Sequence, residues 1–398
     1  MILAPLLRKR VPVALQATVL LLCPVAAAAA QRAAGAAAPA PVPKATHTYW
    51  VYVGAESADL LHRIRFGPDG ATVERTIPVG ESPTELEGPH GLQISRDGKF
   101  LHLTTGHGSP DGKYWKYALG PDTLAGPGIF LGYFPASIDV TPDGLYAFVV
   151  NFNLHGAMVP SSVSVVYTPT NTEVARTETC TMPHGSRIDP SGARQYSTCM
   201  MDDQLVEIDT RTFAVARRFG LAKGKEGPLV VQASADTPHA AHGPPRTMPP
   251  ASCSPTWAQP STDGRKIYVA CNRADEIVEI DRDAWSITRR FKTGRGPYNL
   301  AVTPDGRLLV ASLKQGGGVQ LFDLASGATV LQAKSSTTVT HGIVITPDSR
   351  YAFVSNEGVG AAPGKVDVYD LRALARVASV DVGQQAGGVA FWKMEPAR

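Results

Sequence analysis

A segment of about ten residues that recurs along the chain is the strongest constraint on its fold. Residues 89–98, 135–144 and 297–306 each open with Pro, continue as an apolar run and end in Asp-Gly. We mark each copy, full or shortened, by the residue that follows its opening Pro or Thr. The marked positions are 90, 136, 184, 256, 298 and 341, and the intervals between them are 46, 48, 72, 42 and 43 residues. The one long interval predicts an insertion at about 221–250. Self-similarity at such a period is typical of propeller and solenoid architectures.

Each repeat has the pattern of four short strands. In the fifth copy, a run at 300–302 meets the turn 304–306, where Pro fixes φ and Gly accepts the positive φ of a tight turn. Further strand patterns follow at 308–312, 319–324 and 328–332. Four antiparallel strands in every repeat of this length are typical of a propeller blade.

The two ends of the chain complete the ring. The pattern at 48–54 is that of a second strand, and the first strand that it lacks reappears at 386–392, with Gly387 at the marked position 46 residues after His341. Because a closed ring leaves no exposed sheet edge, this arrangement is favourable. The sequence therefore predicts an all-β, seven-bladed β-propeller with four antiparallel strands per blade, closed by the C-terminal strand in the N-terminal blade.

The first thirty residues have the pattern of an export signal. Arg8, Lys9 and Arg10 precede an apolar stretch and the small residues 28–30. We expect a signal peptide at 1–30, an Ala/Pro-rich linker at 31–47, the propeller at 48–393 and a tail at 394–398. No later segment has 18 consecutive apolar residues, so we expect no transmembrane segment in the mature chain. The protein is then periplasmic or secreted, and we expect a monomer.

Charge and motif content exclude several functions. The chain has 38 Lys and Arg against 35 Asp and Glu, and the excess of 3 lies in the leader, so no nucleic-acid partner is expected. The sequence has no Gly-x-Ser-x-Gly, Walker, His-Glu-x-x-His, Cys-x-x-Cys-His or EF-hand motif. Any chemistry must therefore come from residues that the ring brings together.

Four cysteines remain after the leader. Cys180 and Cys253 lie just before marked positions, whereas Cys199 and Cys271 close second strands. In an exported protein this arrangement favours the disulfides Cys180–Cys199 and Cys253–Cys271. Thiolate ligation of a soft metal is the alternative.

Histidines mark the face where first strands begin and second strands end, which we call the mouth. His90, His184 and His341 occupy marked positions, and His107 and His155 follow second strands. Converging imidazoles suit copper or zinc far better than magnesium or calcium. We predict a metal site, with copper favoured and zinc or a haem-type cofactor as alternatives. A metal-free polar pocket and purely structural histidines remain open.

Other residues are expected near the same face. The insertion carries His239 and His242, and its Pro-Pro pairs favour a lid over a disordered loop. A further ligand role for either histidine is the alternative to a lid that only covers the pocket. The predicted pocket residues, which bind a small molecule or merely cap strands, are Asn151, Asn272, Asn356, Tyr298, Trp257, Arg273 and Glu357.

Residues 296–306 and 276–282 resemble the repeats of YVTN-type seven-bladed propellers, and the resemblance covers nearly all of 48–393. The Pro-His-Gly units at 89–91 and 183–185 are similar to the histidine-bearing propeller of nitrous oxide reductases, without its His-His pair or its cupredoxin domain. Three functions follow as hypotheses: a metal-dependent redox or metal-binding protein, a lactonase-like hydrolase, and a non-catalytic binding module. The expected partner is a small-molecule ligand or a periplasmic redox protein.

Overall fold

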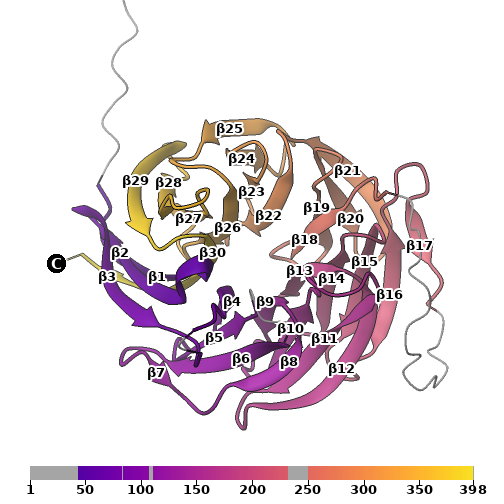
Figure 1. Cartoon of the computed structure of the whole chain (residues 1–398). Helices are drawn as coiled ribbons and strands as arrows, with labels where there is room; N and C mark the ends of the chain where they lie inside the picture. The colour runs from indigo at the N-terminus through magenta and orange to yellow at the C-terminus, as the bar shows by residue number, and fades with distance from the viewer. Residues whose placement is uncertain (1–43, 83, 107–110, 232–249, 398) are drawn as a thin grey trace, which may run out of the picture. The chain divides into compact units, whose positions relative to one another are not determined.

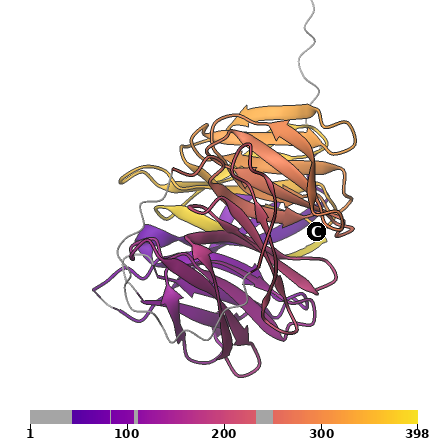
Figure 2. The same cartoon turned by 90° about the vertical axis from the view of Figure 1, so that its right-hand side faces the viewer.

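The computed structural model describes residues 44–82, 84–106, 111–231 and 250–397. These residues form seven antiparallel sheets, which surround a common axis as the blades of a propeller (Figure 1). In the side view, the orange strands of the late blades and the purple strands of the first blades lie at opposite edges of the ring (Figure 2). The predicted leader, 1–30, and most of the linker lie outside the described residues.

The first blade contains both ends of the ring. Its strands, from the axis outward, are β30 (Ala386–Pro396), β1 (His47–Ala55), β2 (Leu60–Gly67) and β3 (Gly70–Pro78). The C-terminal strand β30 pairs antiparallel with β1, with Tyr52 opposite Ala390 and Val53 opposite Val389. The predicted closure of the ring is therefore confirmed.

Blades two to four follow in chain order. Blade two comprises β4 (Pro89–Ile94), β5 (Phe100–Thr105), β6 (Asp111–Ala118), β7 (Thr123–Leu124) and β8 (Ile129–Tyr133). Blade three comprises β9 (Pro135–Val140), β10 (Tyr146–Asn151), β11 (Pro160–Tyr167) and β12 (Thr172–Thr181). Blade four comprises β13 (Pro183–Ile188), β14 (Arg194–Cys199), β15 (Gln204–Asp209), β16 (Val215–Gly220) and the short extra strand β17 (Gly227–Leu229).

Blades five to seven have four strands each. Blade five comprises β18 (Pro255–Pro260), β19 (Lys266–Cys271), β20 (Glu276–Asp281) and β21 (Ser286–Lys292). Blade six comprises β22 (Pro297–Val302), β23 (Leu308–Leu313), β24 (Gly318–Asp323) and β25 (Thr329–Lys334). Blade seven comprises β26 (Thr340–Ile345), β27 (Tyr351–Asn356), β28 (Gly364–Asp370) and β29 (Ala375–Val382).

The core lies between neighbouring blades. Second and third strands are almost wholly buried, because both of their faces pack against adjacent sheets. Between blades one and seven, for example, Tyr49 and Phe66 pack edge-on against Tyr351, with ring centroids 5.1 and 4.9 Å apart. Fourth strands alternate between exposed and half-buried residues, as the rim of the ring requires.

The Asp-Gly turns close the inner hairpins on the face opposite the mouth. In the sixth blade, Thr303 Oγ1 donates to Asp305 Oδ1 over 2.6 Å and accepts from the backbone N–H of Leu308 over 2.9 Å. Gly306 follows with φ of 71°. These aspartates are turn residues, as the sequence predicts.

Both predicted disulfides are present. Cys180 bonds to Cys199, and Cys253 bonds to Cys271. The first links the outer strand of blade three to the second strand of blade four, and the second fastens the segment before β18 to the end of β19. None of the described residues forms a helix long and apolar enough to cross a membrane.

Candidate functional site

The mouth begins with the second residue of every inner strand, which is the marked position of the repeat. The seven residues are His90, Ala136, His184, Thr256, Tyr298, His341 and Gly387. Two residues before each of them, the backbone has positive φ, between 46° and 66°, at Gly88, Phe134, Met182, Ser254, Gly296, Val339 and Gln385. The register against the second strand also shifts at each marked residue. A bulge of this kind re-aims a side chain.

A second set of residues surrounds the first. The residue that follows each second strand is, in blade order, Glu56, Gly106, Phe152, Met200, Asn272, Lys314 and Glu357. Six of these seven line the same cavity as five of the marked residues, and the cavity has a volume of about 280 Å³. Two sets of repeat positions therefore line one cavity at this face of the ring. From here on, the mouth denotes this cavity and its lining.

Glu56, His90 and His341 form the tightest cluster of metal-binding groups among the described residues. One donor atom from each lies within 4.8 Å of the others, and all three side chains are buried. His90 Nε2 is 3.8 Å from Glu56 Oε1, and the His90 and His341 ring centroids are 5.4 Å apart. Two donors bound to one ion at about 2.1 Å lie up to about 4.2 Å apart, so small movements suffice for shared coordination.

Backbone contacts orient the histidine rings. His90 Nδ1 lies 2.7 Å from the carbonyl oxygen of Ala136 in the next blade, and His184 Nδ1 lies 2.9 Å from that of Thr256. Because a carbonyl oxygen can only accept, both Nδ1 atoms carry the proton, which makes Nε2 the nitrogen with the lone pair. This carbonyl contact is typical of metal-binding histidines.

Burial favours the uncharged forms of His184, His341 and Glu56. It lowers the pKa of His184 to about 4, and it lowers the pKa of His341 well below the usual value, with Lys314 and the other histidines adding to the effect. Burial, together with the carboxylate of Glu357, raises the pKa of Glu56 well above its usual value. A buried cation is the natural partner for such a set of neutral nitrogens and a carboxyl group.

His184 has a different environment from the other two marked histidines. The Tyr298 hydroxyl lies 2.8 Å from His184 Nε2, so the hydroxyl donates to this nitrogen. Burial raises the pKa of Tyr298 to about 12, which keeps the donor protonated. The His90 and His184 ring centroids are 6.3 Å apart, so His184 lies beside the Glu56 cluster and supports Tyr298.

Lys314 supplies a positive charge beside the cluster, because its partner atom Glu357 Oε1 is also 3.8 Å from His341 Nε2. Its ammonium group lies 2.9 Å from Glu357 Oε1 and 4.3 Å from the centroid of the Tyr298 ring. Burial alone would lower the pKa of Lys314, but Tyr298 and Glu357 outweigh burial and raise it. Lys314 is therefore a fixed cation at neutral pH.

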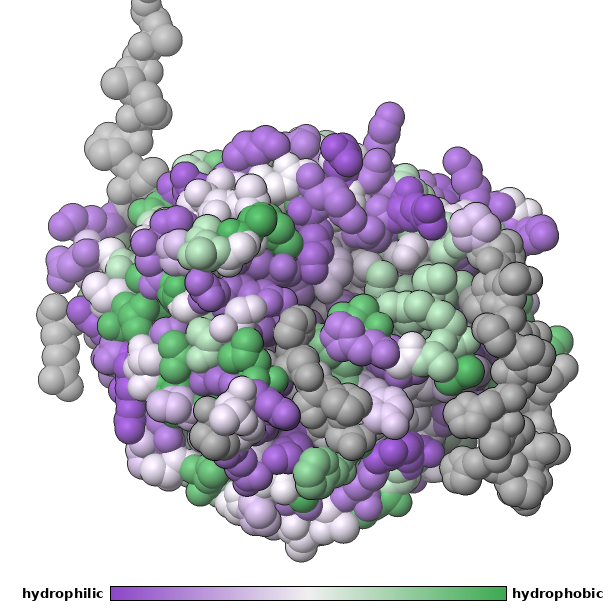
Figure 3. Space-filling view, viewed as in Figure 1, coloured by the Kyte–Doolittle hydropathy of each residue, from purple (hydrophilic) through white to green (hydrophobic). Residues whose placement is uncertain are grey.

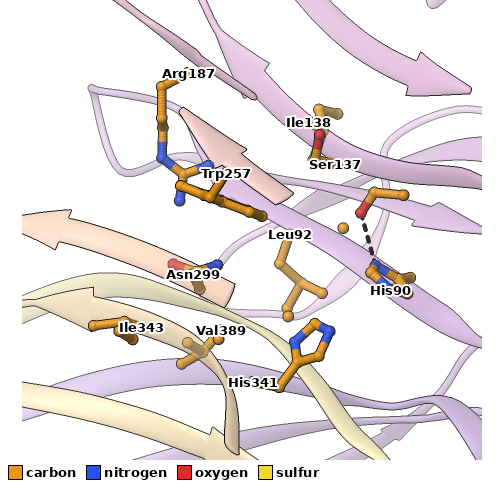
Figure 4. A pocket seen from close by; sticks show the side chains of 14 residues that line it. His90, Leu92, Ser137, Ile138, Arg187, Trp257, Asn299, His341, Ile343 and Val389 are labelled. Atoms are coloured by element: carbon orange, nitrogen blue, oxygen red, sulfur yellow. Dashed lines mark hydrogen bonds between the residues drawn. The ribbon is translucent and has the colours of Figure 1, made fainter. Parts of the chain in front are cut away.

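A narrow chamber of about 30 Å³ continues along the axis beneath the mouth. Figure 4 shows His90 and His341 at one side of it and Arg187, Trp257 and Asn299 at the other. The guanidinium of Arg187 stacks on Trp257, 4.6 Å from its ring centroid. His90 and His341 line both spaces, so they separate the wide mouth from this chamber.

The structure brings together some of the residues predicted from sequence. His90, His184 and His341 converge because their side chains reach inward from blades two, four and seven. Tyr298, Asn272 and Glu357 line the mouth with them. His155 is exposed on the rim, with its ring centroid 5.8 Å from that of Phe134. His107, His239 and His242 lie outside the described residues.

Other predicted pocket residues lie elsewhere. Asn151 is fully buried inside blade three, where its amide donates to Ser162 and Ser164. Asn356 is fully buried inside blade seven and donates to Asp367. Trp257 lines the chamber below the mouth, and Arg273 is exposed at the surface.

Sequence reasoning missed Glu56 and Lys314, although each directly follows a second strand. Glu56 begins the 3₁₀ helix η1 (Glu56–Ala58) after β1, and Lys314 follows β23. The rule that selected His107 and Asn272 would have found both residues, had it been applied to every blade. Gly387 is a further signal, because a Cβ at this marked position would lie 2.3 Å from Glu56 Oε1.

Comparisons with known proteins show the fold alone. No family model and no curated protein matches the chain. The structure is similar to the periplasmic gluconolactonase of Pseudomonas aeruginosa, with TM-score 0.64 and 17% identity over 87% of this chain and 99% of that one. It is also similar to Kuenenia stuttgartiensis hydrazine synthase, with TM-score 0.58 and 17% identity over 79% and 92% of the chains. A protein from Lactobacillus plantarum gives TM-score 0.62 and 13% identity over 87% and 100%.

Proposed function

We propose that this protein is an exported metalloprotein that binds one divalent transition-metal ion through Glu56, His90 and His341. The observation that carries the proposal is the convergence of three donor atoms within 4.8 Å at the mouth, from three different positions in the ring. His90 and His341 extend from bulged inner strands, and Glu56 begins the short helix that follows β1, so the three donors come from ordered elements. These three residues line the cavity, so an ion that they held would be accessible to a small molecule there.

Copper is the favoured ion. Two imidazoles and a carboxylate are nitrogen and oxygen donors, and divalent copper binds such sites more tightly than zinc or the earlier first-row metals. The mouth, at about 280 Å³, is at the lower limit of common ligand pockets, which favours a bare ion over a haem-type cofactor. A copper ion here would serve redox chemistry on a small substrate or with a periplasmic redox partner.

Zinc-dependent hydrolysis is the second candidate. The presence of a glutamate beside two histidines favours it, because this donor set occurs at catalytic zinc sites. One structural neighbour is named a periplasmic gluconolactonase, which makes a cyclic ester a reasonable first substrate to test. A non-catalytic binding module would need no ion at all.

The export of the protein supports either chemistry. Disulfides persist in oxidising compartments outside the cytoplasm, and both disulfides lie at the mouth end of their blades. We therefore place the protein in the periplasm or the external medium, as the leader sequence predicts. The YVTN-type assignment of its repeats is part of the same proposal.

Metal analysis tests the proposed function. The full chain, exported by its own leader and purified without a polyhistidine tag, is stripped with a chelator and dialysed against copper or zinc. We expect one ion per chain and tighter binding of copper. Glu56→Gln and His341→Gln should each weaken the affinity by more than about a hundredfold, because outer ligand partners alone contribute about ten- to a hundredfold.

Two further variants sharpen this test. Gly387→Ala keeps every ligand but places a Cβ where the Glu56 carboxylate lies, so it should reduce metal binding with little loss of stability. Glu395→Gln and His47→Gln, at the end of blade one that is far from the mouth, are matched controls and should still bind one ion. Wild-type protein that takes up no metal, or full metal content in both Glu56→Gln and His341→Gln, would overturn the proposal.

A further inference from the structure

The wall of the mouth is divided into an apolar part and a charged part. The apolar part comprises Phe134, Phe152, Leu154 and Met200, which come from blades three and four and the segments beside them. Phe134 and Phe152 pack edge-on with ring centroids 5.8 Å apart, and Leu154 and Met200 pack against the same small cluster. This wall offers a surface for a hydrocarbon group.

The charged part lies across the cavity, on blades five to seven. Lys314 is its cation and is held by Glu357 and by the Tyr298 ring. Beside it, Asn272 and Gln315 exchange two side-chain hydrogen bonds of 3.1 and 3.3 Å, which fixes both amides. On the face shown in Figure 3, the hydrophilic side chains at the top of the view lie over the outer strands β21 and β25, at the rim of blades five and six rather than in the mouth.

Charge balance then selects the ligand. Among the described residues that line the mouth, the acidic and basic side chains are Glu56, Glu357 and Lys314. His90 and His341 are neutral as ligands, and His184 is neutral because Nδ1 donates to a backbone carbonyl while Nε2 accepts from Tyr298. A divalent ion bound to ionised Glu56 leaves the site with one net positive charge. A buried net charge is costly, and a bound monoanion removes it.

We propose that the metal-loaded mouth binds a small monoanionic amphipath, namely a carboxylate with a hydrocarbon or aromatic body. This inference rests on the proposed function, because the bound ion supplies the excess positive charge. The carboxylate lies toward Lys314 and the ion, and the apolar body lies against Phe134 and Phe152. A charge-assisted contact to Lys314 and burial of the body contribute independently to the affinity.

Four probes of related shape test the inference with the copper-loaded full chain. Benzoate, benzyl alcohol and benzylamine share the ring and differ in charge, while acetate keeps the charge and lacks the ring. Titration calorimetry should show benzoate binding at least about tenfold more tightly than benzyl alcohol, since a hydrogen bond to a charged group contributes at least that factor. Benzoate should also bind at least about tenfold more tightly than acetate, because acetate has no ring to bury against the apolar wall. Benzylamine should bind most weakly.

Two variants test separately how the charge of Lys314 and the apolar surface of Phe152 contribute to the affinity. Lys314→Gln should weaken benzoate about tenfold and leave benzyl alcohol unchanged, whereas Phe152→Ala should weaken benzoate and benzyl alcohol but not acetate. Lys99→Gln, which removes an exposed lysine near the Asp97 turn on the opposite face, is the control and should bind all four probes as the wild type does.

Metal content is measured on every sample, so the two proposals fail separately. Equal affinities for benzoate and benzyl alcohol in protein that carries one ion per chain would overturn the ligand inference and leave the metal site standing. Unchanged benzoate binding by Lys314→Gln would overturn it as well. Failure to take up metal would overturn the proposed function. Equal benzoate affinities of the metal-free and the copper-loaded protein would overturn the charge argument on which the ligand inference rests.

Discussion

The inner strands end in repeated turns on one face of the ring and in varied side chains at the mouth. On the turn face, a Ser or Thr hydroxyl donates to an Asp carboxylate two residues later in five blades, at Ser95, Thr141, Ser261, Thr303 and Thr346. At the mouth, the seven marked positions hold five residue types, with histidine recurring in three blades. The turn residues that recur from blade to blade specify the fold, whereas the marked residues that differ between blades form the candidate site.

The two ends also differ in how they are held. The turn face relies on local hydrogen bonds within each hairpin. The mouth end has two disulfides, positive φ before every inner strand and buried ionisable groups. Such groups cost stability, and the covalent links offset part of that cost.

Removal of β30 should have the largest effect, because this strand closes the ring and its first residues also lie at the mouth. It pairs with β1 along the first blade, and its first residues adjoin Glu56 and His90. Truncation after Gln385 should abolish soluble, folded protein, since it opens the ring and exposes the edge of β1. Soluble yield and thermal melting measure this, with deletion of residues 397–398 as the control. An unchanged melting temperature after the large truncation would contradict the closure.

Acidification should destabilise the protein through its buried histidines. Burial lowers the pKa of His102, within blade two, to about 3 and that of His184, at the mouth, to about 4. The unfolded chain therefore binds more protons below pH 6.5, so stability falls as pH falls, until each folded pKa is reached. Between pH 7 and pH 5, each group lowers the free energy of unfolding by about 2 kcal/mol.

Glu56 has the opposite effect on the pH dependence of stability. Its pKa is raised in the folded state, so the stability that it costs at neutral pH is recovered as pH falls. Metal-free wild type should therefore lose less stability between pH 7 and pH 5 than the Glu56→Gln variant, which should lose at least about 4 kcal/mol from His102 and His184 together. Urea denaturation with a chelator present, at both pH values, measures the difference. Identical pH profiles for the two proteins would count against an ionisable Glu56 in the mouth.

Loss of a disulfide should have the next largest effect. Each bond closes a loop with a sequence separation of 19 or 18 residues, so its removal costs about 3 kcal/mol through the greater entropy of the unfolded chain. The paired variants Cys180→Ser with Cys199→Ser and Cys253→Ser with Cys271→Ser test each bond separately by urea denaturation. Thiol titration of denatured, unreduced, exported protein from which the leader has been removed should find no free thiol, and reduction should release four. Two or more free thiols would be inconsistent with these pairs.

The repeat pattern was sufficient to predict the fold, the closing strand and the disulfides, because each depends on spacing along the chain. It also predicted that His90, His184 and His341 face one mouth, because all three have the same repeat position. The approach of His90 to His341 could not be read from blade numbers, because it depends on bulges that turn both side chains inward.

The direction of a side chain at a strand end was the least predictable property. Asn151 and Asn272 follow similar apolar runs, yet Asn151 is still within β10 and points into its blade, whereas Asn272 lies one residue past β19 and lines the mouth. A shift of one residue reverses the direction of a side chain in a strand. Sequence patterns locate strand ends less finely than this, so they selected Asn356 and missed Lys314.

The smallest effect is expected on the turn face, and it completes the comparison of the two ends. Thr303→Val removes the hydroxyl that donates to Asp305 and accepts from the backbone of Leu308. Because Thr303 is buried and Val has nearly the same shape, the cost should be that of the lost hydrogen bonds, about 1–2 kcal/mol in the free energy of unfolding. Thr346→Val, the same change in the next blade, should cost a similar amount. Neither variant should change metal content or benzoate affinity, since the substitution lies at the far end of the inner strand from the mouth. Loss of metal from either variant would show that the two ends are coupled through the strand, and the division between fold and site would have to be abandoned.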